Sequence, residues 1–255
     1  MPSNVLIVGA TRGLGFELAK QYASKGHHVT GTARSGPPED APPIIKWISG
    51  VDVAVESAGK TIAAGIKSQQ QDVVIISAGY FGKESFDEPD FDAEVTMYKT
   101  SAIGPVFITH ALEKAGLLKK GTKLILVSSE AGSITLRHES EGGGMYGHHA
   151  SKAALNMVGK LLSFDLKDMG VAVGLVHPAF MRTEMTRGVG FDKFWDEGGA
   201  VTPDVSAKSL SDWIDTFDIR QTGEYWAPRG AGDIGTAEPT IGPTDKLPTP
   251  LQLPW

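Results

Sequence analysis

The sequence predicts a single α/β domain built on a doubly wound, parallel β-sheet with helices on both faces. Three observations support this fold class. Short apolar runs alternate with longer segments of helical pattern, several runs are apolar on both faces, and neither a break in composition nor an internal repeat divides the 255 residues. Because a strand that is apolar on both sides must be covered on both sides, the alternation places helices above and below one sheet. We therefore expect residues 1–255 to form one domain.

The individual elements follow from this alternation. Six strands are expected where the chain is apolar over a short run: Val5–Val8, His28–Ala33, Ile44–Ile48, Val73–Ser77, Lys123–Ser128 and Val171–Val176. Four helices are expected between these runs: Gly15–Lys25, Ala54–Gln70, Phe91–Ala115 and His149–Met169. Gly116 and Gly170 directly follow the last two helices, and glycine at this place is typical of a helix end.

The C-terminal segment, from about residue 230 to residue 255, is rich in glycine and proline and is expected to be irregular. It ends with the apolar side chains of Leu251, Leu253 and Trp255. Burial of these side chains would dock the segment onto the domain, whereas its overall composition is also compatible with free disorder. The sequence leaves both alternatives open.

Composition and charge narrow the function classes. The chain has 24 basic and 30 acidic residues, a formal net charge of -6, which disfavours nucleic acid and anionic membrane as partners. It has no cysteine, so disulfides and thiol catalysis are excluded. No signal peptide, membrane-spanning run or metal-ligand spacing is visible. We expect a cytoplasmic protein that acts on a small molecule without a metal.

A glycine-rich turn lies between the first expected strand and the first expected helix. It reads Gly9-Ala10-Thr11-Arg12-Gly13-Leu14-Gly15. Glycines let the backbone approach a pyrophosphate closely, and the free amides at a helix start favour its negative charge. The spacing Gly-x-x-x-Gly-x-Gly differs from the general Gly-x-Gly-x-x-Gly fingerprint, but its position disfavours a merely flexible turn. These residues predict a Rossmann-type dinucleotide site.

Further motifs lie on the fourth helix or directly after an expected strand. They are Asp52-Val53, Ser77-Ala78-Gly79, Ser128-Ser129, Ala150-Ser151-Lys152-Ala153-Ala154-Leu155-Asn156 and His177-Pro178-Ala179-Phe180-Met181-Arg182-Thr183. With these motifs the chain resembles the classical short-chain dehydrogenase/reductase family over nearly its whole length. It is most similar to the small carbonyl-reductase-like subgroup, especially fungal members, but its active site is atypical. The resemblance implies the fold, a nicotinamide cofactor and carbonyl reduction.

The same resemblance implies further roles along the chain. Asp52 and Val53 would contact adenine, and the cofactor would also meet Ser77, Ala78, Gly79, Pro178 and Thr183. A substrate lid would follow the sixth strand at about residues 184–202, where Phe191, Phe194 and Trp195 are apolar. The helices 91–115 and 149–169 would form the contacts of a homodimer or homotetramer.

The end of the second strand indicates which dinucleotide is bound. An acidic residue there would hold a ribose diol and repel a 2′-phosphate, but the chain carries Arg34 and Ser35 instead. Arg12 in the glycine turn could reach the same phosphate, and arginine suits bidentate phosphate binding. The alternative is that both arginines are solvated surface residues. We expect NADP(H) as the cofactor.

The family's reductases use serine, tyrosine, lysine and often asparagine. Ser129 and Lys152 match the serine that polarises the carbonyl and the lysine that binds the nicotinamide ribose. The asparagine position, three residues before Gly104-Pro105, is Ser101. The tyrosine position, four residues before Lys152, is His148, one helical turn away on the same face.

The proton donor therefore has alternatives. The Lys152 ammonium would lower the pKa of His148, so a neutral imidazole that binds an oxyanion or accepts a proton is expected more than an imidazolium donor. Tyr146 is an alternative donor, because it follows Ser133 by thirteen residues, although residue 150 is alanine rather than lysine. A third interpretation is that His148 is an inactive spacer.

The segment between Ser129 and His148 is longer than the family pattern, at nineteen residues rather than about thirteen. It contains the polar run Arg137–Gly144, which would bind a charged or polyhydroxylated substrate or remain a solvated face. His138 in this run is a candidate second proton carrier.

Three functions follow from these residues. The first is an NADP(H)-dependent oxidoreductase that reduces a ketone or aldehyde of a small molecule, such as a secondary metabolite. The second is an isomerase, dehydratase or cyclase that uses His148 as a base without net redox change. The third is a non-catalytic NADP(H)-binding regulator.

Overall fold

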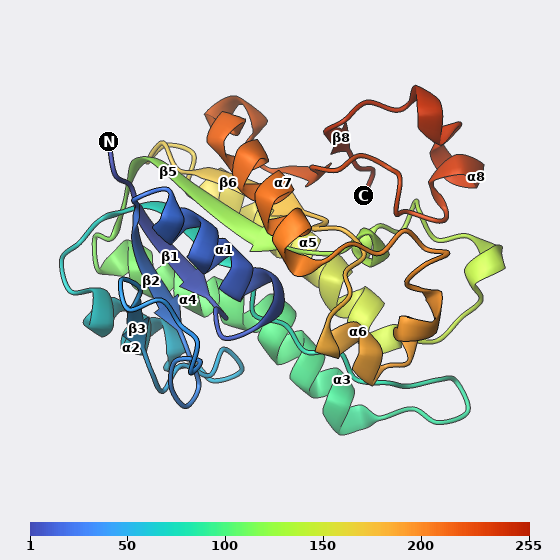
Figure 1. Cartoon of the computed structure of the whole chain (residues 1–255), viewed down its shortest axis with the longest axis horizontal. Coiled ribbons are helices and arrows are strands. Elements are labelled where there is room, and N and C mark those ends of the chain that lie inside the picture. Colours follow the sequence, from blue (N-terminus) through green and yellow to red (C-terminus); the bar gives the residue numbers. More distant parts are fainter.

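A computed structural model describes all residues 1–255, and its central feature is one eight-stranded sheet (Figure 1). The strand order is β3-β2-β1-β4-β5-β6-β7-β8, with all neighbours parallel except the antiparallel pair β7–β8. The strands are β1 (Asn4–Val8), β2 (His28–Thr32), β3 (Lys46–Ile48), β4 (Gln71–Ile76), β5 (Leu118–Val127), β6 (Ala172–Val176), β7 (Glu224–Ala227) and β8 (Leu251–Gln252). This order confirms the doubly wound sheet and places a topological switch point between β1 and β4.

Eight α-helices accompany the sheet. They are α1 (Gly13–Ser24), α2 (Ala58–Ile66), α3 (Phe91–Tyr98), α4 (Gly104–Lys114), α5 (Tyr146–Asp165), α6 (Glu184–Gly188), α7 (Pro203–Thr216) and α8 (Ala237–Ile241). Short helical turns are η1 (Lys99–Ile103, a π-turn), η2 (Glu130–Gly132), η3 (Glu139–Glu141), η4 (Phe191–Phe194), η5 (Ile219–Gln221) and η6 (Thr244–Lys246). None of these helices combines the length and apolar character that crossing a bilayer requires.

Alternate side chains of the strands face two separate cores. Val5 and Ile7 of β1 pack with α1 and α7 on one face, and Leu6 and Val8 pack with α2, α4 and α5 on the other. Figure 1 shows α1 and α7 together on one side of the sheet. Both faces are therefore covered, as the two-sided apolar strands predict.

Three helix boundaries predicted from the sequence are wrong. The helix expected at 54–70 is only α2, because Asp52 begins a turn in which its Oδ1 accepts a hydrogen bond from the Ala54 amide. The helix expected at 91–115 is divided into α3 and α4 by the π-turn at 99–103. The helix expected at 149–169 begins earlier, at Tyr146, and ends at Asp165.

The C-terminal segment is docked rather than free. Leu251 and Leu253 are buried, and the Trp255 ring stacks on Tyr225 of β7 with 5.7 Å between ring centroids. The segment forms the short helix α8, the turn η6 and the two-residue strand β8 and is otherwise irregular. The backbone amide of Leu253 donates to the carbonyl of Tyr225, which fixes the segment against β7.

Candidate active site

A large cleft lies at the carboxyl ends of the parallel strands, at the switch point between β1 and β4. Its volume is about 1680 Å³, which exceeds the 300–1,000 Å³ of a typical small-molecule site and leaves room for a dinucleotide and a second molecule. All the residues predicted to bind the cofactor line it: Gly9, Thr11, Arg12, Gly13, Leu14, Gly15, Arg34, Ser35, Asp52, Val53, Ser77, Ala78, Gly79, Lys152, Pro178 and Thr183.

The glycine turn is shaped to bring backbone close to a ligand. A Cβ on Gly15 would lie 2.1 Å from the Gly9 carbonyl oxygen, and a Cβ on Gly9 would lie 2.6 Å from Cα of Ala78. The Gly9 amide donates to Oγ1 of Thr32 at 3.0 Å, which ties the turn to the end of β2. No side chain caps the start of α1, so its first amides are available for an anion. These features fit a pyrophosphate group.

The two arginines expected at a 2′-phosphate lie on the rim of the cleft. Arg34 is exposed just after β2, and no carboxylate lies within ion-pair distance of it. Arg12 is also exposed, and its only ion pair is a 3.5 Å contact with exposed Glu184. An ion pair of this kind contributes little to stability, so both guanidinium groups are available to a phosphate.

Lys152 is buried in the floor of the cleft. Its Nζ donates to the carbonyl oxygen of Val127, the last residue of β5, at 2.8 Å. Burial lowers the pKa of Lys152 to about 8, because the ammonium loses its hydration without gaining a carboxylate partner. One of its three N–H groups is used by Val127, so two remain for a ligand.

Ser129 lies directly after β5 and lines the same cleft. Its Oγ accepts a hydrogen bond from the Ala131 amide at 3.2 Å, so the hydroxyl proton remains free to donate. The neighbouring Ser128 is buried and donates to Oδ1 of Asn156 at 2.7 Å. Both serines line the cleft, but only the Ser129 hydroxyl has a proton that is not already donated to another side chain.

His148 lies on α5 one turn before Lys152 and also lines the cleft. Its ring stacks on Phe81, with 3.9 Å between centroids and 16° between planes. Burial, followed by the Lys152 charge, holds the pKa of His148 well below its usual value. The ring is therefore neutral near pH 7, and its Nδ1 is enclosed without a hydrogen-bond partner.

The remaining candidate catalytic residues are Tyr146, His138 and Ser101, and only the first two line the cleft. Tyr146 is the first residue of α5 and is exposed on the cleft wall. His138 also lines the cleft, but its Nδ1 lies 2.8 Å from Oγ of Ser140 and caps the turn that begins there. Ser101 is buried in the π-turn, does not line the cleft, and its Oγ has no hydrogen-bond partner.

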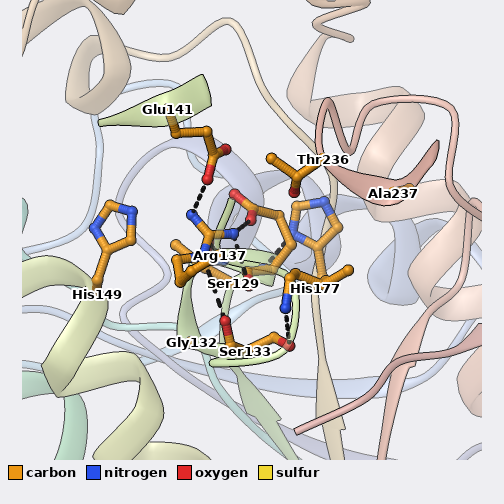
Figure 2. A network of polar contacts seen from close by, with 12 residues as sticks. Ser129, Gly132, Ser133, Arg137, Glu141, His149, His177, Thr236 and Ala237 are labelled. Atoms are coloured by element: carbon orange, nitrogen blue, oxygen red, sulfur yellow. Dashed lines mark hydrogen bonds and ion pairs between the residues drawn. The ribbon is translucent and has the colours of Figure 1, made fainter. Parts of the chain in front are cut away.

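The long segment before α5 carries a cluster of charged side chains, which Figure 2 shows around Arg137. The guanidinium pairs with Glu130 and, at 2.9 Å, with Glu141. His149 lies beside this group in Figure 2, and burial lowers its pKa. Arg137 is thus already paired with two carboxylates. In the polar run expected either to bind substrate or to remain a solvated face, Arg137, His138 and residues 141–144 line the cleft, whereas Glu139 and Ser140 are exposed and do not line it.

Two buried carboxylates that hold segments of the site were not predicted; Asp233 lines the cleft and Glu84 does not. Glu84, in the loop after β4, accepts a 2.5 Å hydrogen bond from the Gly147 amide and so holds the start of α5. Asp233, in the C-terminal segment, accepts hydrogen bonds from His177 at 3.0 Å and from the Phe180 amide. Both residues come from loops far away in the sequence, and no motif marks them.

An aromatic wall lines the cleft beside His148. Phe81 meets Phe191 edge-on at 5.8 Å, and Phe191 in turn meets Phe180 and Phe194 at 6.4 and 6.2 Å. All four rings line the cleft. Phe191 and Phe194 belong to the segment expected to form a lid, and residues of α6 and η4 in this segment line the cleft.

Comparisons with known proteins identify the family of the chain. The family model described as short chain dehydrogenase matches residues 3–193. The chain is 30% identical over 225 residues to 1-hydroxy-2-glutathionyl-2-methyl-3-butene dehydrogenase of Rhodococcus sp. strain AD45, which covers 88% of this chain and 95% of that protein. It is 33% identical over 252 residues to an uncharacterized oxidoreductase of Saccharomyces cerevisiae, covering 89% and 96%.

A solved structure has the same fold at lower identity. NADPH-bound carbonyl reductase from chicken fatty liver superposes with a TM-score of 0.76 and 21% identity, covering 89% of this chain and 91% of that one.

Proposed function

Since the chain belongs to the short-chain dehydrogenase family, a family of oxidoreductases, we propose that it is an NADP(H)-dependent reductase of a ketone or aldehyde on a small molecule. The observation that carries this proposal is the placement of Ser129, His148 and Lys152 in the same cleft as the glycine turn. A nicotinamide cofactor bound there supplies the hydride. The residues of the chain then have to bind the cofactor, orient the carbonyl and stabilise the developing oxyanion.

Lys152 and Ser129 each have free hydrogen-bond donors, which suit binding of the cofactor and orientation of the carbonyl, respectively. The two N–H groups of Lys152 that Val127 leaves free would hold the hydroxyls of the nicotinamide ribose. The proton of Ser129 would donate to the substrate carbonyl oxygen, because its Oγ already accepts from Ala131. Donors fixed in this way stabilise negative charge as it develops.

His148 takes the place of the usual tyrosine with a different role. A neutral imidazole has one N–H donor and one acceptor nitrogen, so it can bind an oxyanion but is a poor source of a full proton. We therefore expect slow turnover and a preference for activated carbonyls, such as α-dicarbonyl compounds and quinones. The aromatic wall of Phe81, Phe180, Phe191 and Phe194 suits a flat, apolar substrate next to this ring.

The preference for NADP(H) rests on Arg34 and Arg12. The exposed guanidinium of Arg34 at the end of β2, without an acidic neighbour in that position, favours a 2′-phosphate. Arg34→Ala should weaken NADPH binding by roughly 10- to 100-fold, the loss of one or two charge-assisted hydrogen bonds, and leave NADH binding unchanged. Equal dissociation constants for NADPH and NADH in the unaltered protein would remove Arg34 from this role.

The reaction is tested by following the absorbance of reduced nicotinamide with a panel of carbonyl compounds. The panel includes activated ketones, aromatic aldehydes and an aldehyde conjugated to glutathione, because the Rhodococcus relative is named for a glutathionyl substrate. NADPH oxidation that depends on the carbonyl supports the proposal. Tight NADPH binding without oxidation on any compound would contradict it and favour a non-catalytic regulator.

A second candidate function uses the neutral state of His148. A neutral imidazole is a competent base, so an isomerase, dehydratase or cyclase could use the same site without net redox change. Product formation with unchanged nicotinamide absorbance would identify this case.

We also propose that a second copy of the chain packs on α4 and α5. Met157, Leu161 and Phe164 follow one another at helical spacing on α5 and are more than half exposed, and Phe107 of α4 is 42% exposed. A homodimer or homotetramer that buries this face should dissociate on Leu161→Glu, which light scattering can measure. We further propose a small-molecule partner only and a cytoplasmic location, in keeping with the acidic net charge of the chain.

A further inference from the structure

Four segments that are distant in the sequence converge behind Ser129. They are the turn after β5, the end of β6, strand β7 and the C-terminal segment, which contribute Glu130, His177, Tyr225 and Asp233. The side chains of His177 and Asp233 are only 5% and 6% exposed, and Tyr225 is fully buried. None of these three side chains has a place in the cofactor or catalytic sets described above.

The first contact to Ser129 runs through His177. The backbone amide of Glu130, the residue after Ser129, donates to Nδ1 of His177 at 3.0 Å. Nδ1 must therefore be unprotonated, and the ring must carry its proton on Nε2. Nε2 lies 3.0 Å from Oδ2 of Asp233, so the imidazole donates there.

Asp233 fixes this arrangement from the other side. Its Oδ2 accepts from both His177 and the amide of Phe180, in the loop that follows β6. A carboxylate that accepts from Nε2 selects one tautomer and one ring orientation, as in other carboxylate–histidine pairs. Burial alone would raise the pKa of Asp233, but the interaction with His177 and the hydrogen bond from the Phe180 amide stabilise the ionised carboxylate, and the net result is a lowered pKa.

The second contact to Ser129 comes from Tyr225. The phenol hydroxyl donates to the carbonyl oxygen of Ser129, which also accepts from the Gly132 amide at 2.8 Å. The Tyr225 ring is held in turn by Trp255 stacked against it. The peptide group between Ser129 and Glu130 is thus anchored at both ends, its carbonyl oxygen by Tyr225 of β7 and its amide by His177 after β6.

We propose that Asp233 is a positioning residue for the reaction, because through His177 it orients the Glu130 amide and so directs the hydroxyl of Ser129 toward the substrate carbonyl. This inference rests on the proposed reductase function. It deepens that function by making the C-terminal segment part of the catalytic arrangement. A displacement of about 1 Å in a catalytic donor can cost about 100-fold in rate, which makes such an anchor measurable.

The test compares Asp233→Ala with Asp233→Asn in the full chain. Asparagine keeps one oxygen that can accept from both His177 and Phe180, whereas alanine leaves both donors unpaired. We expect kcat to fall roughly 10- to 100-fold in Asp233→Ala and no more than about threefold in Asp233→Asn. The dissociation constant for NADPH should stay within about twofold in both variants. Asp245→Ala, an exposed carboxylate in the same segment, is the matched control and should leave every value unchanged.

Hydrogen exchange of the backbone gives a readout that needs no turnover. In Asp233→Ala, amides in segments 128–133 and 177–180 should exchange faster, while those of the glycine turn and α1 should not change. Asp233→Asn should match the unaltered protein. If the unaltered protein reduces no carbonyl, the proposed function fails, yet this pattern still reports whether the anchor exists.

Three outcomes would overturn the positioning role. They are an Asp233→Ala protein with normal kcat, equal loss in the alanine and asparagine variants, and exchange that rises over the whole domain together with weaker NADPH binding. The last outcome would indicate that Asp233 serves only the stability of the fold. Tyr225→Phe, which removes only the hydroxyl, should lower kcat in the same way while leaving exchange at 177–180 unchanged.

Discussion

The two halves of the cleft are held in different ways. The cofactor half consists of β1, the glycine turn, α1 and the end of β2, and the contact that shapes the turn joins residues close in the sequence, Gly9 and Gly15, although Gly9 also packs on the distant Ala78. The catalytic half consists of Ser129, His148 and Lys152, and its supports come from Glu84, Asp233 and other residues more than fifty positions away. Glycines within the turn determine the shape of the turn, whereas the positions of the catalytic side chains depend on contacts between distant parts of the chain.

The largest expected effect is on cofactor binding alone. Gly15→Ala would place a methyl group 2.1 Å from the Gly9 carbonyl oxygen, and the turn would have to open. We expect NADPH binding to weaken by at least about 100-fold, or about 2.7 kcal/mol, as measured by titration. Gly188→Ala, where the added Cβ meets no atom, is the control. Unchanged affinity in Gly15→Ala would mean that the turn does not hold the pyrophosphate.

The next largest expected effect is a loss of catalytic rate without a loss of cofactor affinity. His148→Ala removes the ring stacked on Phe81 and should lower kcat roughly 100-fold, the value of one oxyanion donor, with NADPH affinity unchanged. Tyr146→Phe, at the exposed start of α5, should change kcat less than about twofold. The reverse pattern in steady-state kinetics would transfer the donor role to Tyr146.

A smaller effect concerns pH. The pKa of Lys152 is lowered to about 8, so its ammonium form prevails below that pH and is lost above it. Carbonyl reduction should therefore decline as the pH rises through about 8, and the low pKa of His148 should leave the rate flat between about pH 6 and pH 7. An acid limb near pH 6.5 that disappears in His148→Gln would instead show that the imidazole titrates in this range.

The smallest expected effect concerns backbone strain in the loop after β6, next to the cofactor residue Pro178. Ala179, in the loop between Pro178 and Phe180, has a φ of 110°, a region that favours glycine. Ala179→Gly should stabilise the protein by about 1 kcal/mol in denaturant unfolding, with cofactor binding unchanged. A destabilised variant would mean that the methyl group contributes more through packing than its backbone costs.

The sequence is informative about the fold where apolar periodicity is strong. The first six strands are predicted because each is a short, mainly apolar run and several are apolar on both faces, and their parallel order follows from the intervening helices. Strands β7 and β8 and helix α7 are not predicted. β7 has only four residues, and the helical face of α7 alternates apolar residues with several serines and aspartates. Their burial depends on partners that only the assembled sheet provides.

The residues of the candidate site likewise divide into those that sequence motifs predict and those that only the tertiary structure reveals. The glycine turn, Ser129, Lys152 and the replacement of tyrosine by His148 are all visible as motifs. Glu84 and Asp233 are not, because a carboxylate in a polar loop is ordinarily solvated, and only the tertiary structure shows that these two are buried acceptors. Phe81 is likewise recognised as a site residue only from its stacking on His148.

The two-residue strand β8 covers the outer edge of β7, and the prolines at positions 250 and 254 have no amide hydrogen with which to extend the ladder. While the segment is docked, a foreign strand cannot add to this side of the sheet. Any state in which the segment has detached but the sheet persists would expose the aromatic-rich β7 as a template for intermolecular pairing. The domain should thus be most prone to aggregation under mild heating, before its core melts, with the first intermolecular contacts forming along β7.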